Sequence, residues 1–344
     1  MRMTVAAYIV LAFGAFSVYD TSVMRPVSLL CLCVAAALVL PSCEDFDGPP
    51  PAGSVRASDP VADALLADAA NAKTLGKSIS KLKEIVRYHE LAPCAPLARY
   101  RLAQAYEQQK DYREAFKTYS KLIDAYPQSP LYTEALNRQL TMAMNAANGS
   151  LKTPVLWGAW QTDMEATVVI EWLRTIILKA PYNDMAATAS SILAKYLVDI
   201  EKFDDARMEY RRIVENYPDS KYAPEAQLML AQLWANDHTR GDNNLVNLTN
   251  AREAYEEFSL RFPNHKDAGK ALSQASDMKR LLVQQELEVG RFYLERSHEY
   301  TSAIFCFEDV IRQKKDNPEA AATAQTLLQQ ARAAAANPPK RSFL

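Results

Sequence analysis

The chain has 344 residues, of which 49% are hydrophobic and 23% are charged, and these values are ordinary for a folded protein. Its 39 basic and 41 acidic residues leave a formal net charge of −2, and no lysine or arginine block occurs, so the composition excludes a basic nucleic-acid-binding surface. The sequence contains 9 glycines among segments rich in alanine, leucine and glutamine. This composition favours helices over a sheet with many tight turns.

Two apolar runs lie near the N-terminus. Residues 4–19 form the first run, and residues 27–40 form the second, which follows Arg25 and precedes Ser42. A positive residue, an apolar run and a small residue before a processing site are the three parts of an export signal. Both runs are shorter than a membrane-spanning helix, which needs about 20 residues, so a retained transmembrane helix is the less favoured alternative.

The segment that ends at Cys43 resembles a bacterial lipoprotein signal. The resemblance implies cleavage before Cys43, a covalent diacylglycerol on its thiol and an acyl chain on its amine, with no other cofactor. We therefore expect residues 1–42 to be a signal segment, with either Met24 as the true start or the preceding residues as an extension of it. Residues 43–58 contain proline and glycine without apolar periodicity, which predicts a tether. Glu44 does not decide between inner and outer membrane.

One helical frame recurs through the body of the chain. Its spacing is that of two amphipathic helices followed by a proline. The first copy consists of Leu102, Ala103, Tyr106, Ala115, Tyr119 and Pro127. The second copy consists of Leu193, Ala194, Leu197, Ala206, Tyr210 and Pro218. Both copies resemble the tetratricopeptide repeat, a unit of about 34 residues whose two antiparallel helices stack on the next unit. The resemblance implies an all-α solenoid of five to six helical hairpins.

We expect this solenoid to occupy residues 59–336 and to be followed by a disordered tail over residues 337–344. The first helix is predicted over residues 61–72, because an aspartate and a proline precede it as a helix start. An apolar stripe that continues from Lys266 to Gly290 predicts one long helix near the C-terminus. A last, slightly stretched repeat is predicted from the frame residues Gly290, Tyr293, Tyr300, Ala303, Phe307 and Val310, and residues 318–336 are predicted to form a closing helix.

Two insertions interrupt the repeats. Residues 147–161 separate helices that are expected over residues 131–146 and 162–180, and they carry Trp157 and Trp160. A second, polar insertion covers residues 236–247. Insertions in solenoids form loops on one face, which is often a binding face. The two tryptophans either cap their own repeat or contact a partner, and the sequence leaves both possibilities open.

The C-terminal third carries a more specific likeness. The blocks Asn250–Phe258, Arg261–Asn264 and Glu288–Arg296 resemble the lipoprotein D subunit of the β-barrel assembly machinery, the BamD-like family. This resemblance implies a lipid-anchored scaffold on the periplasmic face of the outer membrane. Its implied partners are other assembly subunits and unfolded outer-membrane protein clients. A second lipoprotein class, tetratricopeptide scaffolds for cell-wall synthesis or envelope constriction, stays open as an alternative.

The first helix of each tetratricopeptide repeat lines a groove that can hold a client segment. Ten positions of this groove follow from the consensus register and are therefore candidate protein-binding residues. They are Tyr100, Gln104, Glu107, Gln108, Ser191, Lys195, Asp199, Leu228, Gln232 and Asn236.

Motifs for chemistry are absent from the sequence. It has no glycine-rich phosphate loop, no Gly-x-Ser-x-Gly and no Cys-x-x-Cys, and its four histidines are scattered among the repeats. Cys94 and Cys306 lie far apart in the body, so no disulfide framework is expected. We therefore expect a scaffold that is not an enzyme, with no metal, no nucleic acid and no small-molecule substrate.

Overall fold

The computed structural model describes residues 58–155, 160–239 and 245–337, which all belong to one unit of the chain. The predicted signal segment, its lipidation site Cys43 and the tether up to residue 57 lie outside these residues, as does the C-terminal segment 338–344. The predictions for these segments therefore stay predictions.

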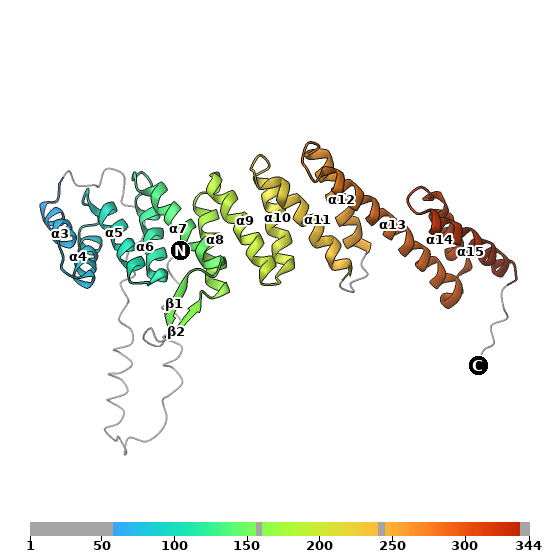
Figure 1. The fold of residues 1–344 in the computed structure, drawn as a ribbon, viewed down its shortest axis with the longest axis horizontal. Helices are drawn as coiled ribbons and strands as arrows, with labels where there is room; N and C mark the ends of the chain where they lie inside the picture. Colours follow the sequence, from blue (N-terminus) through green and yellow to red (C-terminus); the bar gives the residue numbers. More distant parts are fainter. Residues whose placement is uncertain (1–57, 156–159, 240–244, 338–344) are drawn as a thin grey trace, which may run out of the picture. The chain divides into compact units, whose positions relative to one another are not determined.

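The described residues form thirteen α-helices, one short π-helix and one two-stranded sheet (Figure 1). In chain order the elements are α3 (Pro60–Ala70), α4 (Leu75–Tyr88), α5 (Ala95–Gln108), α6 (Tyr112–Ala125), α7 (Tyr132–Ala147), β1 (Lys152–Val155), β2 (Trp160–Asp163), α8 (Ala166–Lys179), α9 (Asp184–Asp199), α10 (Phe203–Asn216), α11 (Ala223–Thr239), α12 (Leu245–Arg261), α13 (Ala268–Phe292), η1 (Tyr293–Ser297), α14 (Tyr300–Arg312) and α15 (Pro318–Ala336).

Each helix packs against the next helix in the chain, which gives six helical hairpins from α3/α4 to α13/α14 and a closing helix, α15. The prediction of an all-α solenoid is confirmed. Side-chain caps set several helix starts, because a helix leaves its first N–H groups without intrahelical partners. Asp59 Oδ1 accepts a hydrogen bond from Ala62 N over 3.1 Å at the start of α3, and Asn317 Oδ1 accepts one from Ala320 N over 3.0 Å at the start of α15.

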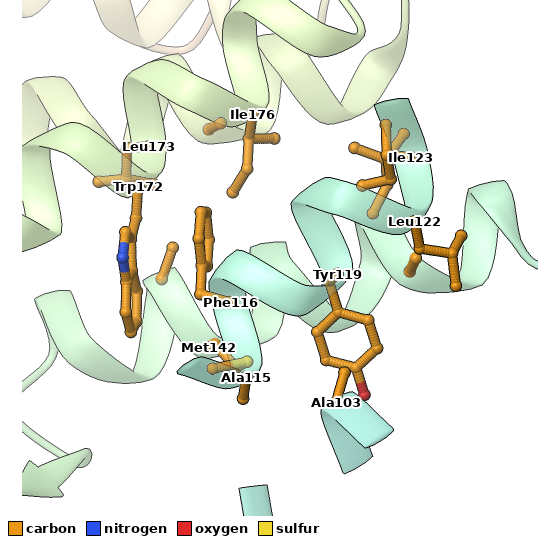
Figure 2. Close-up of a cluster of buried hydrophobic side chains, with 14 of the residues drawn as sticks. Ala103, Ala115, Phe116, Tyr119, Leu122, Ile123, Met142, Trp172, Leu173 and Ile176 are labelled. Atoms are coloured by element: carbon orange, nitrogen blue, oxygen red, sulfur yellow. The ribbon is translucent and has the colours of Figure 1, made fainter. Parts of the chain in front are cut away.

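Small and large residues of the repeated frame alternate in the core. Ala103 and Ala115 are fully buried and let α5 and α6 approach closely, while Tyr119 and Leu122 fill the space beside them. Figure 2 shows this cluster, in which Phe116 of α6 lies against a tryptophan of α8. The two rings are stacked, with their centroids 4.5 Å apart and their planes inclined by 2°. The tryptophan is Trp172, which belongs to the core and not to the insertion.

The first insertion contains a β-hairpin that the sequence did not predict. Strands β1 and β2 pair antiparallel, with Thr153 opposite Thr162, and Lys152 and Asp163 form an ion pair across them. The expected helix start at residue 162 is therefore wrong, because residues 160–163 pair with β1 and the helix begins at Ala166. β-Branched residues opposite each other favour this pairing over an early helical turn.

The predicted long helix is confirmed as α13, which covers Ala268–Phe292. Gly290 of the expected last repeat lies within α13, and the C-terminal half of α13 is the first helix of the last hairpin. The close approach of α14 explains the glycine. A Cβ atom at position 290 would lie 2.6 Å from Phe307 Cε1 and 3.2 Å from Cys306 Cβ.

Candidate protein-binding groove

The candidate groove residues lie on α5, α9 and α11, the first helices of three hairpins. The structure divides them into residues that hold neighbouring helices together and residues whose polar groups are available. The first kind stabilises the groove, and the second kind can contact a ligand.

Tyr100 and Glu107 of α5 connect this helix to its neighbours. The buried Tyr100 donates a hydrogen bond to Glu134 Oε1 of α7 over 3.3 Å, and burial raises the pKa of its hydroxyl. Glu107 accepts a hydrogen bond from Tyr119 Oη over 2.6 Å and binds the guanidinium of Arg138, whose Nε lies 3.2 Å from Oε1. This hydrogen bond with Glu107 raises the pKa of Arg138. These two candidates are therefore structural links between α5, α6 and α7.

Gln104 and Gln108 lie at a pocket of about 280 Å³ between the first two hairpins, which we call the N-terminal pocket. It is lined by Ala69, Ala70, Leu75, Ser78, Leu82, Arg101, Gln104, Ala105 and Gln108. Its apolar wall includes Leu82, Ala69 and Ala105, which are all buried. An apolar wall with a few polar groups around it is the usual composition of a ligand site.

The polar groups around the N-terminal pocket are available for a ligand. In the part of the chain that the structure describes, the side chains of Arg101, Gln104 and Gln108 have no hydrogen-bond or ion-pair partner. Each glutamine amide carries both a donor and an acceptor, as a peptide group does, and the guanidinium offers several donors. The pocket can therefore hold an apolar side chain while the amides bind the backbone of the same segment.

The candidates on α9 differ in exposure. Ser191 is buried, whereas Lys195 and Asp199 are exposed. Lys195 Nζ lies 3.1 Å from Glu225 Oε1 at the start of α11, so this lysine links two first helices. Both side chains of this ion pair are exposed, and exposed ion pairs contribute only about 0–1 kcal/mol to stability. A charged ligand can therefore displace one partner of the pair at small cost.

On α11, Leu228 is partly buried and packs against the cluster formed by Tyr255, Phe258 and their neighbours. Gln232 is partly buried and Asn236 is exposed. The structure therefore places these three residues on α11 without bringing them to the N-terminal pocket. Trp157 and the side chain of Trp160 lie outside the described residues, so both readings of the tryptophans stay open.

Three residues of the site were not predicted from the sequence. Arg101 lies one helical turn from Gln104 but is not a consensus groove position, and Glu134 and Arg138 lie on α7. The repeat that contains α7 is interrupted by the insertion, which obscured its register. The spacing of Glu134 and Arg138 by one turn of an amphipathic helix is the signal that could have revealed them.

A larger cavity of about 550 Å³ lies beside α10 and is lined by Glu201, Lys202, Phe203, Asp204, Asp205, Arg207, Asp237 and Asn247. Arg207 is buried there and forms ion pairs with Asp204 and Asp237, and its guanidinium lies 4.3 Å from the ring centroid of Trp234. Its charge is therefore already neutralised. The available groups at the smaller N-terminal pocket make that pocket the better candidate for binding.

Comparison with known proteins supports the repeat assignment. The family described as tetratricopeptide repeat matches residues 97–129 and 189–220, which are the two repeats with the clearest frame. No curated protein matches the chain.

Three solved structures are similar to the chain. A tetratricopeptide repeat protein from Parabacteroides merdae is 11% identical, with 80% of this chain and 100% of that chain covered and a TM-score of 0.30. The MamA fragment 41-end from Desulfovibrio magneticus RS-1 is 15% identical, with 60% and 96% covered and a TM-score of 0.29. The MamA RS-1 ArsTM double mutant is 13% identical, with 65% and 97% covered and a TM-score of 0.29.

The described residues form an all-α tetratricopeptide-repeat solenoid, and repeats of this kind indicate a scaffold for protein partners. Tetratricopeptide repeats bind proteins and are not a catalytic fold. Among the described residues, no three His, Cys, Asp or Glu side chains are grouped so that they could hold a metal ion. None of the described helices has the length and apolar character needed to cross a membrane.

Proposed function

We propose that this protein is a lipid-anchored periplasmic scaffold of the machinery that assembles β-barrel proteins in the outer membrane. It binds segments of unfolded clients in its first-helix groove and binds partner subunits over its remaining surface. The N-terminal pocket is the observation that carries client binding. Its apolar wall can bury a client side chain, and Arg101, Gln104 and Gln108, which have no partner among the described residues, can bind the client backbone.

Three sequence features support the cellular setting. The segment before Cys43 has the parts of a lipoprotein signal, and the residues after it provide a tether. The blocks between Asn250 and Arg296 resemble the lipoprotein D subunit of the assembly machinery. A covalent diacylglycerol and an acyl chain on Cys43 would hold the scaffold at the periplasmic face of the outer membrane.

The scaffold acts by recognition and without covalent chemistry. An apolar client side chain loses contact with water in the N-terminal pocket, and each buried methylene contributes about 0.8 kcal/mol. The amides of Gln104 and Gln108 bind peptide groups of the client, which an unfolded segment offers along its whole length. Recognition of this kind suits many client sequences.

Site-specific photo-crosslinking tests client binding. A photoreactive amino acid at position 104 should crosslink to outer-membrane protein precursors, because this position lies at the N-terminal pocket. The same amino acid at position 325, an exposed glutamine on α15, is the matched control and should give no such adduct. Equal crosslinking at both positions, or none at position 104, contradicts the proposed client site.

Affinity purification from membranes tests the proposed partners. Co-purification of β-barrel assembly subunits is the expected outcome. Recovery of cell-wall synthesis or envelope-constriction proteins without any assembly subunit would contradict the proposal and favour the alternative, a scaffold for cell-wall synthesis or envelope constriction.

Substitution of the anchor residue tests the localisation. Cys43→Ser removes the thiol that would carry the diacylglycerol, so the protein should move from the membrane fraction to the soluble fraction. Cell fractionation and immunoblotting measure the distribution. Membrane association that persists after this substitution contradicts the lipid anchor and favours a retained N-terminal membrane helix.

A further inference from the structure

Two carboxyl groups meet where the last hairpin closes, between α13 and α14. The side chains of Glu286 of α13 and Asp309 of α14 are both bound by the side-chain amide of Gln313. Gln313 Nε2 donates to both of them, over 3.0 Å to Glu286 Oε2 and over 2.9 Å to Asp309 Oδ2. Two carboxyl groups that share one donor can hydrogen-bond to each other only when one of them keeps its proton, since two carboxylates have no proton to share and repel each other.

The surroundings decide which carboxyl group keeps the proton. Arg312 binds Asp309 through Nε, which lies 3.1 Å from Oδ1, and through Nη2 at 2.5 Å from the same oxygen. This pairing lowers the pKa of Asp309, so Asp309 is the ionised partner. Burial, followed by the hydrogen bond and the charge of Asp309, raises the pKa of Glu286 to about 7. Glu286 is therefore the partner that carries the proton.

We propose that the Glu286–Asp309 pair is a proton-dependent clasp, which fastens α14 to the long helix α13 while Glu286 is protonated and loosens when this proton is lost. The clasp lies one helical turn from the close contact of Gly290 with Phe307, so it acts on the interface that joins the last hairpin.

The other charged groups around the clasp do not replace this proton. On α14, Arg312 is already engaged by Asp309, and burial raises the pKa of the Cys306 thiol, which stays neutral. The ionisable residues of α15 are Glu319 and Arg332, and Arg332 pairs with Glu308 over 2.7 Å. On α13 itself, Glu288 is bound by Arg291 and Gln284. The charge of Arg312 favours ionised Glu286, but Asp309 already binds this arginine, and the contacts of the described residues give Glu286 no ion pair of its own.

The direction of the pH effect follows from the raised pKa. A carboxyl group whose pKa is higher in the docked state stabilises docking fully at pH values below its ordinary pKa of 4.5. This contribution decreases as the pH rises and is lost as the pH passes through about 7. Asp309 titrates below its ordinary pKa of 3.8 and stays ionised over the neutral range, so it does not oppose the effect.

Hydrogen exchange of the full chain tests the clasp. Between pH 6 and pH 8 the opening equilibrium of α14, corrected for intrinsic exchange and compared with α5 as an internal reference, should rise by up to about tenfold. Glu286→Gln keeps a neutral group that can hydrogen-bond to Asp309, so it should remove most of this pH dependence. Glu288→Gln, on the exposed side of α13, is the matched control and should keep the wild-type response.

A carboxyl-carbon NMR titration supplies a readout that does not depend on folding stability. The side chain of Glu286 should titrate near pH 7 in the folded chain. A Glu286 signal that titrates near its ordinary pKa of 4.5 overturns the proposal. So does an α14 opening equilibrium that is unchanged between the two pH values, or a full pH response that persists in the Glu286→Gln variant.

Discussion

Tyrosines at matched positions of the second helices differ in what their hydroxyl groups meet. Tyr119 and Tyr210 are both fully buried, and each lies four residues after the small residue of its repeat. Tyr119 donates to the carboxylate of Glu107 over 2.6 Å, whereas the hydroxyl of Tyr210 is buried without a hydrogen-bond partner among the described residues. Burial raises the pKa of both tyrosines. The same frame therefore carries a satisfied hydroxyl in one repeat and an unsatisfied one in another.

This difference predicts opposite responses to the loss of one oxygen atom. Tyr119→Phe removes a hydrogen bond to a charged group and leaves a partly buried carboxylate with fewer donors, so it should lower the free energy of unfolding by about 1.5–3 kcal/mol. Tyr210→Phe removes an unsatisfied polar atom from the core and should leave stability unchanged or raise it. Urea denaturation of both variants measures the difference. Equal losses in the two variants would contradict the hydrogen-bond assignment.

At the scale of single elements, the two glycines of α13 have different surroundings. Gly290 packs against α14, and an added Cβ would lie 2.6 Å from Phe307 Cε1 and 2.9 Å from Cδ1 of the same ring. Gly269 lies in the first turn of α13, and, apart from its chain neighbours and the adjacent backbone of its own helix, no atom lies within 4 Å of the place where its Cβ would lie. The long helix therefore tolerates a glycine at one end and needs one at the other.

Alanine at these two positions separates helix propensity from packing. Gly269→Ala should stabilise the chain by up to about 1 kcal/mol, because alanine favours the helix and no contact opposes it. Gly290→Ala gains the same propensity, but the ring of Phe307 must move, so this variant should lose about 1–3 kcal/mol. Thermal melting of both variants checks the pair. A stabilising Gly290→Ala would show that α13 and α14 do not approach as closely as this.

The elements also show how much could be predicted from the sequence. The repeated frame predicted α5, α6, α9 and α10, because small and large residues at fixed spacing determine how two helices pack. The β-hairpin of the first insertion was missed, since pairing of Lys152–Val155 with Trp160–Asp163 depends on partners across a turn and leaves no helical period.

The candidate site was predicted only in part. Consensus register placed Gln104 and Gln108 at the N-terminal pocket, but it also selected Tyr100 and Glu107, which bind α6 and α7. Register assigns a residue to a helix face, and it cannot tell whether a neighbouring repeat supplies a partner. That information depends on Glu134 and Arg138 of the interrupted repeat.

At the scale of the whole described chain, the buried apolar residues form three clusters instead of one continuous core. The largest cluster extends from Ala62 of α3 to Leu233 of α11. A second joins α11, α12 and the first half of α13, and a third joins the second half of α13 with α14 and α15. The long helix α13 belongs to two clusters, so the last hairpin is coupled to the rest of the array mainly through this helix. In repeat proteins, stability is a sum of local terms and contacts between neighbours.

A charge placed in the largest cluster should therefore unfold it without unfolding the last hairpin. Ala206 of α10 is fully buried in that cluster, and Ala206→Glu places a carboxylate there at a cost of several kcal/mol. Met208 of the same helix is 59% exposed, so Met208→Glu is the matched control and should have little effect. Hydrogen exchange of Ala206→Glu should show lost protection in α9 and α10 with protection retained in α14 and α15. Equal loss of protection in all four helices would mean that α13 transmits unfolding and that the array behaves as one cooperative unit. An unchanged exchange pattern would mean that Ala206 does not lie at a helix–helix contact.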